Sequence, residues 1–201
     1  MSEEQRVAWD EKYKAQGTLW SRSHDRWFET KDSDRILDLG CGTGKSSASM
    51  AGVVVAVDFS MAALRLFGDN VPSASRICCN ITSLPFKDAQ FDVVRASFII
   101  GHLKEKERAE AMEEINRVLR PEGLIAIEVF SVSDGRFLRK RETASGAEDD
   151  EQLLHAYFNE GQIRHLLSKF NVTSVSEEKW AQRVGPREFL ERSIIRATAE
   201  K

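Results

Sequence analysis

One segment of this chain constrains the fold more than any other, because an apolar run leads directly into a loop with alternating glycines. Residues 35–39 read Arg-Ile-Leu-Asp-Leu, and glycines follow at positions 40, 42 and 44. Glycine adopts positive φ and has no Cβ, so such a backbone turns sharply and its N–H groups can lie directly against a ligand. The segment therefore predicts a buried strand that ends in a ligand-binding loop.

A second apolar run, residues 53–57, ends in Asp58, which follows Asp38 by about 20 residues. An acid at the tip of the second strand of a βαβ unit usually accepts hydrogen bonds from both hydroxyls of a ribose. The loop and the acid together predict a ligand that contains a nucleoside.

Two common nucleotide-binding loops fit the spacing poorly. The dinucleotide fingerprint is G-x-G-x-x-G, whereas this chain reads G-x-G-x-G, which disfavours NAD. The phosphate-binding P-loop needs four residues between its first glycine and the Gly-Lys-[Ser/Thr] ending. Gly40 stands one residue too close to Gly44-Lys45-Ser46, and Leu39 occupies the place of the required glycine. ATP is therefore only a near match.

The loop closely resembles that of class I S-adenosylmethionine (SAM) dependent methyltransferases, where an acid and an apolar residue precede Gly-Cys-Gly-Thr-Gly. Other phrases that these enzymes favour occur downstream: Leu-Pro-Phe at 84–86, Phe-Asp-Val-Val at 91–94 and Leu-Arg-Pro-Glu-Gly at 119–123. The resemblance covers roughly residues 36–130 and implies SAM as the cofactor.

Length and composition indicate one ordinary globular domain. With 201 residues, the chain can bury a full core but has little room for a second domain. Within it we distinguish a lid segment (1–30), a SAM-binding core (31–130), a variable substrate loop (131–158) and a C-terminal helix and hairpin (159–201). A net charge of −3 argues against general nucleic-acid binding.

The sequence also bears on location and on metals. It starts without an apolar signal core, and no window approaches the length of a membrane span, so we expect a cytoplasmic protein with no membrane contact. The three cysteines, at 41, 78 and 79, are expected to be reduced thiols. The histidines lack partners at zinc-ligand spacing, so no metal site is predicted. The oligomeric state stays open.

Alternating apolar and helical patterns predict an α/β fold, a doubly wound parallel sheet with helices on both faces. The expected strands are 35–39, 53–58, 76–80, 91–96 and 124–130; the expected helices are 46–51, 61–67 and 104–119, with a turn at 120–123. A helix at 159–170 and strands at 172–179 and 193–199 follow. The resemblance implies that these last strands form an antiparallel hairpin that completes a seven-stranded, mostly parallel sheet. The first helix is expected to be only a turn or two.

The resemblance also implies roles for individual residues. Asp58 is expected to take the ribose hydroxyls, and Asp38 to orient the loop and the ammonium side of the donor. Asn80 stands where the family often has an Asp that binds the adenine amine. Phe59 and Met61 either cover adenine or pack as core at a helix start. The predicted cofactor-binding residues are Tyr13, Asp38, Gly40, Cys41, Gly42, Gly44, Asp58, Phe59, Met61, Asn80, Ile81 and Ser97.

Acceptor-side residues come from the two ends of the chain and from the fourth strand. Trp9 and Tyr13 fit the Trp-Asp-x-x-Tyr pattern of a lid helix, and aromatic faces attract a sulfonium. Phe98 follows the fourth strand, and His102 either accepts a proton or merely opens the next helix. Residues 134–151 are a solvated loop or a lid whose basic half receives an anionic acceptor. Predicted substrate residues are Trp9, Phe98, Arg136 and Arg183, with His102 as the candidate catalytic residue.

These features predict a methyltransferase that acts on a small molecule by in-line displacement. Residues 96–99 lack the [DNS]-P-P-[FYW] signature of amino methylases that act on nucleic-acid bases. Two alternatives stay open: a SAM-binding protein without catalysis, and a nucleotide hydrolase whose ATP binding would need Lys45. The acceptor itself is outside the reach of the sequence, because loops rather than the fold choose it.

Overall fold

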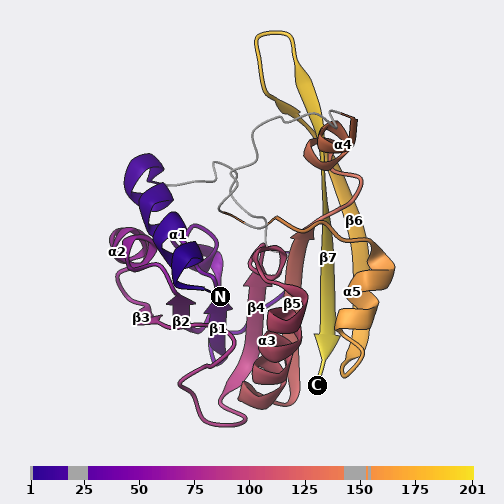
Figure 1. The fold of residues 1–201 in the computed structure, drawn as a ribbon. Coiled ribbons are helices and arrows are strands. Elements are labelled where there is room, and N and C mark those ends of the chain that lie inside the picture. Colours follow the sequence, from indigo (N-terminus) through magenta and orange to yellow (C-terminus); the bar gives the residue numbers. More distant parts are fainter. Residues whose placement is uncertain (1, 18–26, 143–152, 154) are drawn as a thin grey trace.

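The centre of the molecule is one seven-stranded sheet, seen in a computed structural model that describes residues 2–17, 27–142, 153 and 155–201 (Figure 1). The strand order is β3-β2-β1-β4-β5-β7-β6. The strands β1 to β5 pair in parallel, whereas β7 is antiparallel to both β5 and β6. The predicted mostly parallel sheet with an antiparallel C-terminal hairpin is confirmed. The strands are β1 (Arg35–Leu39), β2 (Val53–Asp58), β3 (Ser75–Cys78), β4 (Phe91–Ser97), β5 (Leu119–Phe130), β6 (Asn171–Arg183) and β7 (Phe189–Glu200).

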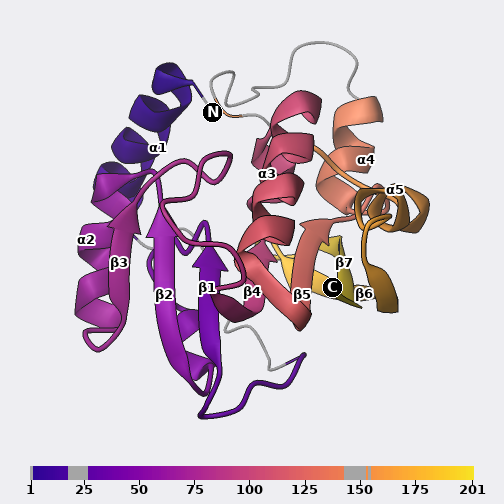
Figure 2. The same cartoon turned by 90° about the horizontal axis from the view of Figure 1, so that it is seen from below.

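Helices cover both faces of this sheet. Phe67 of α2 packs against Ala56 on one face of β2, whereas Ile115 of α3 belongs to the core on the other face, with Val55 and Val57. Figure 2 shows α1 beside α2 at the β3 end of the sheet. The helices are α1 (Glu3–Gln16), α2 (Met61–Asn70), α3 (Glu105–Val118), α4 (Gly135–Glu142) and α5 (Glu160–Leu166), with 3-10 turns at Ser47–Ser49 and Ile100–His102.

The central strands are apolar because both of their faces are buried. After Arg35, every residue of β1 is buried, and the same holds for β2 after Val53. Strands between two helix layers have no solvent face, so apolar residues run continuously instead of alternating. Since β1 lies between β2 and β4, the chain winds away from β1 in both directions. The carboxyl ends of these strands therefore flank the crevice where open α/β sheets bind ligands.

Several boundaries differ from those predicted. The turn expected at 120–123 lies within β5, which starts at Leu119 and continues past a register irregularity beside β4. Within this stretch, Glu122 has a left-handed backbone with φ of +62°. The strand predicted to reach residue 80 ends at Cys78, the helix predicted at 159–170 covers only Glu160–Leu166, and both hairpin strands are longer.

A helix occupies part of the segment predicted to be a solvated loop or a lid. Residues 135–142 form α4, which is anchored by the fully buried Asp134. The Asp134 carboxylate accepts hydrogen bonds from Arg192 Nε at 2.8 Å and from the Ser193 amide at 3.0 Å. The remainder of the predicted loop, residues 143–151, lies outside the described residues.

We expect Asp134→Ala to lower the free energy of unfolding by about 3–5 kcal/mol, because it leaves the buried Arg192 guanidinium without its carboxylate. Urea unfolding measures this loss. The matched control is Glu191→Ala on β7, the strand that carries Arg192. The 3.7 Å ion pair of Glu191 with Lys179 is exposed and contributes about 1 kcal/mol or less. Equal losses in the two variants would contradict this assignment.

Candidate functional site

A cleft lies at the carboxyl ends of β1, β2 and β4, next to α1. The structure brings eleven of the predicted site residues together in its lining: Trp9, Tyr13, Asp38, Gly40, Cys41, Gly42, Asp58, Phe59, Ser97, Phe98 and His102. Five further residues line it that were not among the predicted site residues: Thr43, Lys45, Ser46, Arg95 and Ile99. The lining thus comes from α1, the glycine loop, the carboxyl ends of β1, β2 and β4, and the residues that follow β2 and β4.

The glycine loop leaves no room for side chains at its two central glycines. Gly40 and Gly42 have φ of +64° and +52°, the left-handed region that favours glycine. A Cβ on Gly40 would lie 2.7 Å from Cβ of Ile99, and one on Gly42 would lie 2.8 Å from the hydroxyl oxygen of Tyr13. The bare backbone of this loop therefore lies directly against Ile99 at Gly40 and against the Tyr13 hydroxyl at Gly42.

Asp58 ends β2 with its carboxylate held by main-chain donors. Its Oδ2 accepts a hydrogen bond from the Gly42 amide at 3.0 Å, and its Oδ1 accepts one from the Ser60 amide at 2.9 Å. The side chain is 7% exposed, and this burial raises the pKa of Asp58 to about 6 despite the amide bonds, which act in the opposite direction. The carboxylate is thus fixed in place but close to protonation in mildly acidic solution.

A buried ion pair lies at the other end of the cleft. Arg95 of β4 is the sheet neighbour of Asp38 of β1, and its Nη1 lies 3.4 Å from Asp38 Oδ1. The other Asp38 oxygen accepts a hydrogen bond from the Ser47 hydroxyl. Both charged side chains are almost completely buried and line the cleft, which therefore offers a cation and an anion side by side. A charged residue inside the apolar run 91–96 was the sequence signal for Arg95.

Aromatic side chains line part of the cleft. The Trp9 ring lies 5.9 Å from the Tyr13 ring and meets His102 edge-on at 4.8 Å. Phe98 stacks on Phe130 at 4.6 Å, and its backbone has an unusual φ of +61°. Trp9, Tyr13, Phe98 and His102 thus give the cleft flat ring surfaces as part of its wall.

Ser97 and Cys41 are the two small polar side chains of the lining whose chemical environment is distinctive. The Ser97 hydroxyl is buried and has no hydrogen-bond partner among the described residues, so it is available to bind a polar atom of a ligand in the cleft. Burial, followed by the charges of Asp58 and Asp38, raises the pKa of the Cys41 thiol well above its usual value. Cys41 is therefore a neutral packing residue rather than a nucleophile.

Four predicted cofactor residues lie outside this lining. Gly44 has φ of +79° and faces Phe67 of α2, and Met61 points outward on α2 with 45% exposure. Because β3 ends at Cys78, Asn80 lies in the loop that follows. There its Oδ1 accepts a hydrogen bond from the Thr82 amide at 3.2 Å. Ile81 is buried in the main core.

Two predicted substrate residues also lie elsewhere. Arg136 is exposed on α4, and its amide donates to Asp134 Oδ1. Arg183 lies at the tip of the β6–β7 hairpin, where its guanidinium donates to the carbonyl oxygens of Gly185 and Pro186. Local main-chain contacts thus account for the placement of Arg183, and neither arginine lines the cleft.

The described part of the chain offers neither a membrane span nor a metal cluster. None of its helices has the length and apolar character needed to cross a bilayer. Its His, Cys, Asp and Glu side chains also form no group of three or more suited to a metal ion.

Comparison with known proteins places this cleft in a family context. The family described as "Methyltransferase domain" matches residues 37–127. A demethylmenaquinone methyltransferase of Streptomyces avermitilis is 34% identical over 119 residues, which cover 58% of this chain and 51% of that protein. One from Clavibacter sepedonicus is 37% identical over 130 residues, covering 61% and 51%. The chain spans about half the length of these curated relatives.

Solved structures agree on the fold. A SAM-dependent methyltransferase of Methanosarcina mazei superposes with a TM-score of 0.70 at 24% identity, covering 86% of this chain and 94% of that one. A SAM-dependent methyltransferase of Anabaena variabilis gives 0.75 at 12% identity, covering 97% and 94%. At these identities the likeness extends to the fold alone.

We expect Gly42→Ala to displace the Tyr13 ring and loosen α1, because the new Cβ would overlap the Tyr13 hydroxyl. Hydrogen exchange of the α1 amides measures this loosening. The matched control is Gly42→Ala in a Tyr13→Phe background, which keeps the backbone strain at position 42 but removes the hydroxyl that the new Cβ would overlap. Equal exchange in both variants would show that Tyr13 does not depend on the bare glycine.

Proposed function

We propose that this chain, which belongs to the class I SAM-dependent methyltransferases, transfers a methyl group from SAM to a small molecule with a planar aromatic ring. The observation that carries the proposal is the shared cleft of the bare glycine loop, the Asp58 carboxylate and the Asp38–Arg95 pair. Asp58 suits the ribose of SAM, and the Asp38–Arg95 pair with the glycine loop suits its amino-acid end.

The residues present fit SAM in their donor and acceptor chemistry. The Asp58 carboxylate suits the ribose diol, since its oxygens keep lone pairs beyond those used by the Gly42 and Ser60 amides. Asp38 and Arg95 suit the ammonium and carboxylate groups of the amino-acid end. When bound, SAM supplies a methyl group attached to a positively charged sulfur. The sulfur keeps the electron pair of the broken carbon–sulfur bond and becomes a neutral thioether.

The aromatic rings of the lid suit this charge. Trp9 and Tyr13 line the cleft from α1, and the faces of aromatic rings attract a cation. The protein's main task is alignment of donor and acceptor, and proximity alone supplies on the order of 7–11 kcal/mol of a barrier. No covalent intermediate with the protein is needed, in keeping with the neutral state of Cys41.

The aromatic lining favours a flat acceptor. Trp9, Phe98 and His102 contribute rings to the wall of the cleft, and aromatic pairs stack or meet edge-to-face. His102 is our candidate to accept the proton that the acceptor atom loses as its bond to the methyl carbon forms. The relatives named demethylmenaquinone methyltransferases support a small-molecule acceptor.

A direct test incubates the chain with SAM and a panel of small phenols, quinols and aliphatic amines, and follows release of S-adenosylhomocysteine. We expect turnover with ring acceptors only. Calorimetry with SAM, run separately, distinguishes failure modes: tight binding without turnover would favour a non-catalytic SAM-binding protein, and no heat at all would end the SAM assignment.

We expect the affinity for S-adenosylhomocysteine to fall about tenfold per pH unit below pH 6, because the Asp58 carboxyl must be ionised to accept both ribose hydroxyls. Since burial raises this pKa in the folded chain, the loss of affinity starts at a higher pH than an ordinary aspartate would give. Calorimetry between pH 4.5 and about 8 measures the profile.

Asp58→Asn is the control for this profile. Its amide keeps the shape and one acceptor oxygen but has no proton to take up, so its weaker affinity should not change in the same pH range. A variant that kept both the affinity and the pH profile of the native chain would show that the ribose lies elsewhere.

A further inference from the structure

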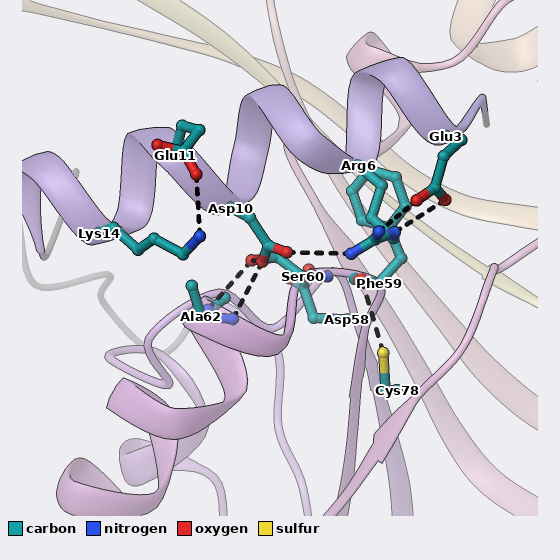
Figure 3. A network of polar contacts seen from close by, with 11 residues as sticks. Glu3, Arg6, Asp10, Glu11, Lys14, Asp58, Phe59, Ser60, Ala62 and Cys78 are labelled. Atoms are coloured by element: carbon teal, nitrogen blue, oxygen red, sulfur yellow. Dashed lines mark hydrogen bonds and ion pairs between the residues drawn. The ribbon is translucent and has the colours of Figure 1, made fainter.

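The lid helix α1 is fastened to the start of α2 by one carboxylate, that of Asp10 (Figure 3). Its Oδ1 accepts hydrogen bonds from the Ser60 hydroxyl at 2.6 Å and from the Ala62 amide at 3.0 Å. Its Oδ2 accepts one from Arg6 Nη1 at 3.0 Å, within the same helix. We call the contacts among Asp10, Ser60 and Ala62 the Asp10 latch.

The latch is strong for a contact between surface helices because it satisfies the start of α2. The first amides of a helix have no partner within the helix, and the helix dipole favours a negative charge there. Ser60, the N-cap residue of α2, accepts the Ala63 amide with its hydroxyl oxygen at 3.1 Å. Asp10 of α1 accepts the Ala62 amide. Burial alone would raise the pKa of Asp10, but the bonds from Ser60 and Ala62 and the Arg6 charge lower it overall. The carboxylate is therefore ionised at neutral pH.

The latch continues directly to the cleft. Ser60, which donates its hydroxyl to Asp10, also donates its amide to Asp58, and Asp58 in turn accepts the Gly42 amide. A continuous series of hydrogen bonds thus leads from the lid helix to the glycine loop. Figure 3 shows Asp10 on α1 facing this turn at the start of α2.

The same helix presents its aromatic side chains to the cleft. Trp9 precedes Asp10, and Tyr13 follows it by three residues, so the three side chains occupy neighbouring positions on one side of α1. Both rings are buried in a cluster with Ala63 of α2. A movement of α1 that removes Trp9 and Tyr13 from the cleft must therefore break the contacts of Asp10 as well.

We propose that Asp10 is a positioning residue that holds the aromatic lid closed over the donor site and so sets how long the donor and its product stay bound. The donor's identity rests on the function proposed above. Asp10 does not touch the ligand; it acts through Ser60 and through the placement of Trp9 and Tyr13.

The test compares Asp10→Ala with Asp10→Asn, using S-adenosylhomocysteine as the probe and stopped-flow dissociation as the readout. Asp10→Ala removes both bonds to α2, and we expect dissociation at least about tenfold faster. Asn keeps an acceptor oxygen for Ser60 and Ala62 and loses the charge together with the acceptor for Arg6, which lies within α1. We therefore expect rescue to within about threefold of the native rate.

Glu11→Ala is the matched control on the same helix. Glu11 pairs at 2.8 Å with Lys14, and both side chains are more than half exposed, so its removal should leave the dissociation rate unchanged. A purely structural role for Asp10 predicts that Asp10→Ala lowers the melting temperature while the rate of product release stays native. That result, or a failure of Asn to rescue, would overturn the proposal.

Hydrogen exchange on the ligand-free chain separates this proposal from the proposed function. We expect the Ala62 amide and the α1 amides to exchange faster in Asp10→Ala than in Glu11→Ala. If the native chain did not bind S-adenosylhomocysteine, the proposed function would be refuted. The hydrogen-exchange rates would still show whether Asp10 holds α1 in place. Should Asp10→Ala not fold, Ser60→Ala removes the shorter of the two bonds between Asp10 and α2 and must still give faster exchange in α1. Unchanged exchange there would refute the latch.

Discussion

The hydrogen bond from the Gly42 amide to the Asp58 carboxylate is the contact on which the geometry of the cleft depends. It joins the loop after β1 to the end of β2, and it forms because a left-handed glycine aims its N–H at the neighbouring strand end. The second oxygen of the same carboxylate fixes the turn into α2 through Ser60. One side chain thus aligns two strand ends and a helix start before any ligand arrives.

Around this contact, the charges of the cleft are compensated rather than isolated. A buried ion is costly unless it is paired or hydrogen-bonded, and here Asp38 has Arg95 while Asp58 has main-chain amides. Both solutions keep charged groups accessible at the cleft without an excess of one sign. A ligand that itself carries both signs, such as an amino acid attached to a nucleoside, is the complement of such a lining.

Much of this architecture could be predicted from the sequence, because strands buried on both faces must be continuously apolar and only glycine permits the loop. What could not be predicted depends on contacts between remote segments. Asn80 was expected to end the third strand, but nothing local shows that β3 stops at Cys78. Arg95 is identified as a site residue only once β4 is known to pair with β1, beside Asp38. The bond between Asp10 and Ser60 joins residues 50 positions apart, which no local pattern reveals.

The left-handed backbone at Phe98 bears on how the cleft meets a second ligand. A bulky residue in this region costs on the order of 1–3 kcal/mol, and it persists only where its surroundings impose it. Here the Phe98 amide donates to the Glu128 carbonyl at 2.7 Å, and the ring is stacked on Phe130. The orientation of the ring is consequently settled during folding, so an incoming molecule meets a ready-made wall and association needs little further loss of side-chain entropy.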